Sequence, residues 1–204
     1  MDLIILAGSS GNGKSTVGKK LHELLKSPFM EFTWLPEFRA LNPHTNITPK
    51  EEEQIAFENM MLVCKNYLRH KFENIIVSDF DDVRLIDIPI QFKDFSYVII
   101  TLYSENDEII KQRMVQRMQT KLKDEESYDN YDFSIKHNKM IATRKLLPNE
   151  YRIRTDNQSP EQIAEHIITI TKEHKPENNF NPSQYTRDDY NTCFNEDGQY
   201  GECI

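Results

Sequence analysis

Short apolar runs alternate along the chain with longer segments in which apolar residues recur at helical spacing. Residues 3–7 form a continuous apolar run that ends at Gly8, which is typical of a strand buried on both faces of a parallel sheet. The apolar residues that follow recur at the spacing of one helix face: Val17, Leu21, Leu24 and Leu25. The first part of the chain is therefore predicted to form a strand, a loop and a helix.

Four further strands are predicted where short segments are rich in β-branched and aromatic residues: 29–34, 75–78, 97–102 and 151–154. Three more helices are predicted from start signals, in which a capping residue is followed by an acidic residue or glutamine: Thr48–Glu51, Ser104–Asp107 and Ser159–Gln162. Strands that alternate with helices predict an α/β fold, a three-layer α/β/α sandwich around a five-stranded parallel sheet.

Composition narrows the class of protein. With 204 residues, 38% of them hydrophobic, the chain is long enough for the core of one domain. A mean hydropathy of -0.68 and the lack of a long apolar run predict a soluble protein without a membrane span. The apolar start is short and has no basic residues before it, which argues against a secretory signal and favours a cytoplasmic location.

Charge and cysteine content narrow the partners. A net charge of -8 argues against nucleic acid as the main partner, although a locally basic cleft can still bind a small phosphate ligand. The three cysteines lack metal-ligand spacing and favour reduced thiols, with a Cys193–Cys203 bridge as the alternative: Cys64, Cys193 and Cys203. The oligomeric state stays open at this level.

The composition changes after residue 175. From there on the chain is rich in Asn, Asp, Glu, Gln and Pro, which is typical of a disordered segment. Isolated aromatic residues offer a second interpretation, in which they pack the segment onto the domain: Phe180, Tyr185, Tyr190, Phe194 and Tyr200. We therefore expect a domain over 1–175 and a polar C-terminal tail over 176–204.

The loop after the first strand carries a phosphate-binding motif. It satisfies the pattern G-x-x-x-x-G-K-[ST], and a threonine follows: Gly8, Ser9, Ser10, Gly11, Asn12, Gly13, Lys14, Ser15 and Thr16. Glycines let the backbone turn its N–H groups towards a phosphate, and the start of the following helix adds a positive dipole. Lys14 is expected to contact the β- and γ-phosphates of ATP, and the Ser15 hydroxyl to bind Mg²⁺.

Three segments resemble the P-loop small-molecule kinases, the group of nucleoside monophosphate kinases and of shikimate and gluconate kinases. They are "GSSGNGKST" at the start, "VIITLYSENDEIIKQRMVQRMQ" in the middle and "RIRTDNQSPEQIAEHI" near the end. The resemblance covers about residues 1–174 and implies a P-loop NTPase fold with a helical lid and kinase activity with ATP. The chain also lacks the Asn-Lys-x-Asp motif of most GTPases, and it has no long strand that ends in paired carboxylates as in a motor ATPase.

The same resemblance assigns residues to the nucleotide. It implies a lid at about 113–130, entered through the pair Arg113 and Arg117, and an adenine site bordered by Thr155, Asp156 and Asn157. Two arginines four positions apart share a helix face and suit the charge on a transferring phosphoryl group, whereas the alternative is a solvated basic face. Lys121, Lys123 and Arg144 are further candidates for lid cations.

Asp79 follows the predicted strand at 75–78. Since ligands of open parallel sheets bind at the carboxyl ends of the strands, Asp79 is the candidate to hold Mg²⁺ or to accept the proton of an acceptor hydroxyl. The alternative is a helix cap, for which aspartate is also favoured.

The acceptor is expected near residues 31–48. Arg39 and Arg84 could bind an anionic group of the acceptor, Trp34 could stack on a ring, and Glu37, like Glu31, is an alternative base. An aromatic residue near a strand end can equally belong to the core.

These observations predict an ATP- and Mg²⁺-dependent kinase of a small molecule. A nucleoside or deoxynucleoside monophosphate is the first acceptor considered, and a sugar-like or antibiotic hydroxyl is the alternative. The chain lacks the D-G-[FY]-P-R segment of many adenylate and uridylate kinases and the glycine triplet of shikimate kinases, so the acceptor stays open. A second class, a nucleotide-binding regulatory protein with a partner-binding tail, is motivated by residues 176–204.

Overall fold

A parallel sheet forms the centre of the computed structural model, which describes residues 1–35, 49–79, 82–120, 131–177 and 180–185. Its strands are β1 (Leu3–Ala7), β2 (Phe29–Glu31), β3 (Ile75–Ser78), β4 (Tyr97–Tyr103) and β5 (Glu150–Arg154). They lie in the order β2-β3-β1-β4-β5, and every neighbouring pair is parallel. The five-stranded parallel sheet predicted from the sequence is confirmed.

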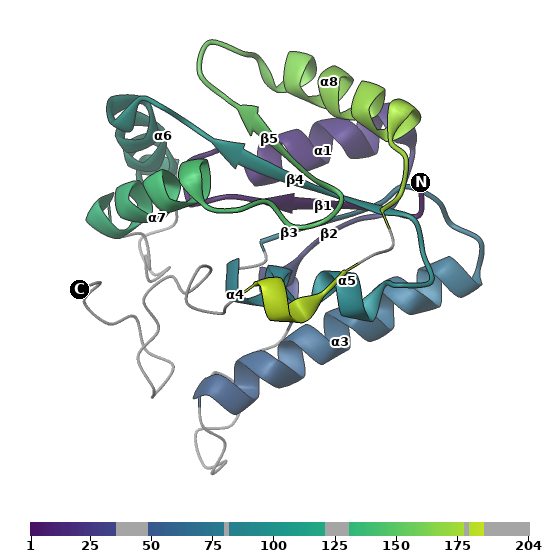
Figure 1. Ribbon diagram of the computed structural model, residues 1–204. Helices are drawn as coiled ribbons and strands as arrows, with labels where there is room; N and C mark the ends of the chain where they lie inside the picture. Colours follow the sequence, from purple (N-terminus) through teal and green to yellow (C-terminus); the bar gives the residue numbers. More distant parts are fainter. Residues whose placement is uncertain (36–48, 80–81, 121–130, 178–179, 186–204) are drawn as a thin grey trace.

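Helices cover both faces of this sheet (Figure 1). One face carries α1 (Lys14–Leu25) and α8 (Pro160–Glu173), and the other carries α3 (Pro49–Arg69), α4 (Asp82–Leu85) and α5 (Ile88–Gln91). Two helices, α6 (Asp107–Thr120) and α7 (Tyr131–Thr143), lie side by side at one end of the sheet. Short 3-10 turns follow β2 (η1, Phe32–Trp34) and α8 (η2, Pro182–Gln184). The three-layer α/β/α sandwich is confirmed.

The central strand explains why its sequence is continuously apolar. Leu3 and Ile5 face the core that α3 and α5 cover, whereas Ile4 and Leu6 face the core that α1 and α8 cover. Successive side chains of a strand point to opposite faces, so a strand with helices on both sides needs apolar residues at every position. β1 thereby anchors the glycine loop in the middle of the sheet.

Two element boundaries differ from the sequence prediction. The second strand ends at Glu31 because β3, its partner among the described strands, ends at Ser78, the residue that pairs with Glu31. The third predicted helix starts at Asp107 rather than next to Ser104, because the Asn106 side chain accepts from the N–H groups of Glu108 and Ile109. The start signal of α8 is confirmed, since Ser159 and Gln162 form a reciprocal capping box.

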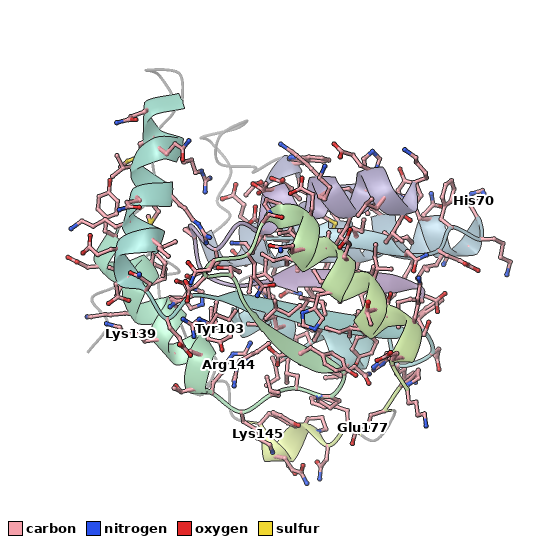
Figure 2. The ribbon with its side chains drawn as sticks, turned by 90° about the horizontal axis from the view of Figure 1, so that it is seen from above. His70, Tyr103, Lys139, Arg144, Lys145 and Glu177 are labelled. Atoms are coloured by element: carbon pink, nitrogen blue, oxygen red, sulfur yellow. The ribbon has the colours of Figure 1, made fainter. Side chains whose placement is uncertain are left out.

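The described start of the tail packs on the domain. Phe180 and Tyr185 contact the core beneath α3 and α5, and their rings lie 5.3 Å apart. Asn149 exchanges two hydrogen bonds with the backbone of Glu177, and Lys145 lies over the Tyr185 ring at 4.2 Å. Figure 2 shows Lys145 and Glu177 beside η2. Within the described residues, no helix combines the length and the hydropathy needed to cross a membrane.

Candidate active site

The loop between β1 and α1 leaves the central strand at its carboxyl end. Gly8 has a φ of 134°, and a Cβ placed on it would lie 2.3 Å from the backbone oxygen of Leu102 in β4. No side chain fits at that distance. Gly8 therefore lets the loop pass directly over the neighbouring strand, as a backbone that approaches a phosphate closely requires.

The N-terminus of α1 is open to an anion. Gly13 occupies the cap position with a φ of 86°, no side chain caps the helix, and its first turn contains no acidic residue. Helix α8 shows the contrast, because a capping box and Glu161 complete its first turn. The first N–H groups of a helix need acceptors and its dipole favours negative charge, so the start of α1 suits a phosphate.

Lys14 and Asp79 meet at the carboxyl edge of the sheet. The Lys14 Nζ lies 3.3 Å from Oδ1 of Asp79 and donates to the backbone oxygen of Ser9 over 3.3 Å. Asp79 directly follows β3 and has a φ of 69°, a left-handed conformation that aspartate adopts more readily than most residues. The sequence predicted both residues at this edge, and the structure brings them into contact.

The residues present fit a magnesium ion held mainly by a nucleotide. Ser15 and Thr16 lie in the first turn of α1, where Ser15 is half-buried and Thr16 is exposed. In the part of the chain that the structure describes, no three His, Cys, Asp or Glu residues gather to hold a metal. Ser15 and Asp79 would supply oxygen ligands, and Mg²⁺ is commonly bound through one or two protein oxygens, phosphate oxygens and water.

Arg113 reaches from α6 to the glycine loop and to the segment after β5. Its guanidinium donates to Oγ1 and to the backbone oxygen of Thr155 over 3.0 and 3.2 Å, and to the backbone oxygen of Gly11 over 3.4 Å. Burial lowers the pKa of this guanidinium, and the Asp156 carboxylate partly opposes the shift, but arginine stays charged at neutral pH. A cation therefore lies between the two segments to which the resemblance assigns the nucleotide.

Asp156 joins the loops after β4 and β5. Its carboxylate accepts from the Ser104 hydroxyl, from the Glu105 N–H over 2.9 Å and from Nε of Arg154 over 2.7 Å. Burial alone would raise the pKa of Asp156, but these hydrogen bonds and the Arg154 charge outweigh it, so the pKa is lowered. Protein donors already engage this carboxylate, whereas Asn157 is exposed. The predicted contact of both residues with a nucleotide stays a prediction.

The predicted acceptor residues are only partly brought together. Trp34 is 59% exposed and its ring lies 5.6 Å from that of Phe29. Arg84 is buried, donates to Oε1 of Gln54 over 2.5 Å and lies 5.6 Å from the ring centroid of Phe57, both in α3. Glu31, the alternative base, is half-buried at the end of β2. Glu37 and Arg39 lie outside the described residues.

The predicted lid is described only at its start. Arg113 and Arg117 lie one turn apart in α6, and Arg117 is exposed. Residues 121–130, with Lys121 and Lys123, lie outside the described residues. Arg144 is buried instead of belonging to a lid, because its guanidinium makes two hydrogen bonds of 2.9 and 2.8 Å to the Glu150 carboxylate. A fully covered carboxylate partner explains why this cation faces inwards.

Comparisons with known proteins find no match for the sequence but do find solved structures with a similar fold. No protein-family model matches the chain, and no curated protein matches it either. Among solved structures, a tunicamycin resistance protein from Deinococcus radiodurans is similar with a TM-score of 0.57 and 18% identity, over 83% of this chain and 94% of that one. A gluconokinase from Sinorhizobium meliloti gives 0.56 and 14% over 81% and 89%, and a sugar kinase from a Janibacter species gives 0.56 and 20% over 83% and 94%.

The chain has the fold of the P-loop small-molecule kinases. In this kinase fold the glycine loop, Lys14 and Asp79 lie together as the sequence predicts. Two polar residues have no sequence signal: Asn138 in α7, which contacts Asn12 of the loop, and Gln54 in α3, which accepts from Arg84. They belong to no motif, and only the folded chain brings them to Asn12 and Arg84.

Proposed function

We propose that this chain is an ATP-dependent phosphotransferase that uses Mg²⁺ and acts on a small molecule. The observation that carries the proposal is the uncapped N-terminus of α1 beside Lys14 and Asp79. A helix start without an acidic residue or a side-chain cap leaves its N–H groups for a ligand, and Lys14 adds a positive charge there. We also propose that residues at about 113–130 form a lid and that residues 176–204 form a polar C-terminal tail.

Each group would have a distinct task. Lys14 and the N–H groups of the glycine loop would bind the β- and γ-phosphate oxygens, and Arg113 and Arg117 would stabilise charge on the transferring group. Ser15 and Asp79 would hold Mg²⁺, which supplies charge neutralisation when bound. The acceptor oxygen would form the new bond to the γ-phosphorus as the bond to the β-phosphate oxygen breaks, with ADP as the leaving group.

A hydroxyl group is the acceptor that Asp79 favours. A hydroxyl must lose its proton when it is phosphorylated, and a carboxylate at the sheet edge can take that proton. Two solved structures with this fold are named as a sugar kinase and a gluconokinase, and both names denote substrates with hydroxyl groups. A nucleoside monophosphate is the second candidate, which the exposed Trp34 ring supports because an indole can stack on a base.

The decisive experiment measures ADP release from Mg-ATP with a panel of acceptors. The panel contains sugars, sugar acids, shikimate, hydroxylated antibiotics, and ribo- and deoxynucleoside monophosphates. We expect acceptor-dependent release that falls at least about 100-fold in Lys14→Ala, since removing one transition-state donor commonly costs that much. Lys20→Ala is the matched control, because Lys20 lies on the same helix in an ion pair with Glu23 and Glu161.

The outcome also separates the enzyme from a regulatory protein. ATP binding without acceptor-stimulated turnover across the whole panel would favour a nucleotide-binding regulatory protein. ADP release that depends on sugars or sugar acids would support a hydroxyl acceptor. ADP release confined to nucleoside monophosphates would support the second candidate.

A further inference from the structure

Asn138 of α7 is buried beside the glycine loop. Its side chain is 1% exposed, and its Oδ1 accepts from Nδ2 of Asn12 over 2.9 Å. Figure 2 labels its neighbour Lys139 and, close by at the same end of the molecule, Tyr103, the residue before Ser104. An amide in this position connects a helix late in the chain with the middle of the glycine loop.

Asn138 is itself held firmly by the end of β4. Its Oδ1 also accepts from the backbone N–H of Ser104 over 3.0 Å, and its Nδ2 donates to the Ser104 backbone oxygen over 2.6 Å. Ser104 is fixed in turn by its hydroxyl, which donates to Asp156. The amide of Asn138 is therefore oriented by the sheet before it contacts the loop.

Asn12 passes this constraint into the loop. Its Nδ2 donates to the Ser9 hydroxyl oxygen over 2.9 Å, across the turn from its own backbone. Its Oδ1 is buried and has no donor among the described residues, so the amide nitrogen alone anchors the side chain. Hydrogen bonds thus run from Ser104 through Asn138 and Asn12 to Ser9, and they hold the loop in one shape. The Ser9 backbone oxygen also accepts from Lys14.

We propose that Asn138 is a positioning residue that holds the glycine loop in its phosphate-binding shape by orienting Asn12. The proposal rests on the proposed function, since a loop shape matters here only if it binds a nucleotide. Asn138 does not touch the phosphate and acts through Asn12. A merely structural role would instead make Asn138 important for folding and irrelevant for nucleotide affinity.

A double-mutant cycle on nucleotide affinity tests the proposal. The Kd for Mg-ATP is measured by titration calorimetry for wild type, Asn12→Ala, Asn138→Ala and the double variant. We expect each single change to raise Kd about five- to tenfold, the effect of losing one or two hydrogen bonds. The Kd of the double variant should not exceed the larger of the two single-variant Kd values, because both residues act through the same series of hydrogen bonds.

The matched control changes packing on the same helix without touching polar groups. Ile141 is fully buried in α7, and Ile141→Val should lower the melting temperature without changing Kd. If Asn138→Ala does not fold, Asn138→Ser takes its place in the cycle. Steady-state turnover gives a second readout. If the loop binds ATP more weakly, the KM for ATP should rise by a larger factor than kcat falls.

Distinct results would overturn the inference and the proposed function. If Lys14→Ala weakens ATP binding but Asn138→Ala leaves Kd within about twofold, or if the two alanine effects multiply in the double variant, the positioning role is wrong and the proposed function stands. If wild type and Lys14→Ala bind Mg-ATP equally, both fail together.

Discussion

The Lys14 ammonium nitrogen lies 3.3 Å from Oδ1 of Asp79, and the contact joins the start of α1 to the end of β3. The two side chains are 10% and 24% exposed, so both are covered but neither is sealed from solvent. A phosphate bound to the loop would compete with Asp79 for Lys14. Nucleotide binding would thereby free the carboxylate for the metal or for the acceptor proton.

Asp79→Asn should abolish most of the turnover and spare the fold. Asparagine also tolerates the positive φ of 69° at this position, so the backbone is not strained by the change. We expect kcat to fall by about 10²–10⁴, the contribution of a general base, while the Kd for ATP without Mg²⁺ stays the same or decreases because Asp79 no longer competes for Lys14. Steady-state kinetics and titration calorimetry measure the two quantities, and an unchanged kcat would exclude Asp79 as base and metal ligand.

Gly8→Ala and Gly13→Ala should differ in stability. Both glycines have positive φ, but only at Gly8 would the new Cβ collide with backbone, whereas at Gly13 it meets no heavy atom within 4 Å. Gly13→Ala should therefore cost only the strain of an unfavourable φ, about 1–3 kcal/mol, and Gly8→Ala clearly more. Urea unfolding gives both free energies, and the opposite order would contradict the close approach of the loop to β4.

Asp156 should make the protein sensitive to acid. Its pKa is lowered in the folded protein from the ordinary value of 3.8, so the unfolded chain takes up a proton first as the pH falls. The stability contributed by its hydrogen bonds is present above 3.8 and is lost as the pH falls through the folded pKa. Asp156→Asn should be less stable than wild type at neutral pH, and unfolding curves from about pH 5 to pH 2 should show this difference shrinking. A difference that does not change with pH would contradict the assignment.

Arg144→Leu should destabilise the fold and leave the affinity for ATP intact. The change removes the cation that pairs with the buried Glu150 carboxylate, and breaking a buried pair in this way typically costs about 3–5 kcal/mol. Lys139→Ala is the control on α7, since the ion pair of Lys139 with Asp107 is exposed and such pairs contribute little. Denaturant unfolding measures the cost, and loss of ATP affinity in a folded Arg144→Leu protein would revive its assignment to the lid.

Local signals in the sequence predicted the parts of the fold that depend on neighbouring residues. The apolar run of β1 and the capping box of Ser159 and Gln162 are complete within a few positions, and both are confirmed. The end of β2 was predicted wrongly because the length of an edge strand depends on its partner, here the end of β3 at Ser78. Ser104 was predicted as a helix cap, but Asp156, far along the chain, accepts from its hydroxyl.

The residues of the candidate site likewise fall into two groups, those that local sequence predicts and those that only packing brings together. The glycine motif and the position of Asp79 after a strand could be predicted because both are written in consecutive residues. The burial of Arg84 against Gln54, the pairing of Arg144 with Glu150 and the contact of Asn138 with Asn12 join residues that no motif connects. Such contacts depend on packing between elements, which periodicity along the chain does not encode.

The unequal starts of α1 and α8 imply a conflict between robustness and activity. An acidic residue at position 15 or 16 would complement the dipole of α1 and make it a better helix, as Glu161 does for α8. The same change would repel the anion that the open terminus suits. Selection for thermostability alone would therefore remove the anion site from the first turn of α1. Stabilising substitutions should instead be made in α8 or on the surface of α3, and Lys14 to Thr16 should be left unchanged.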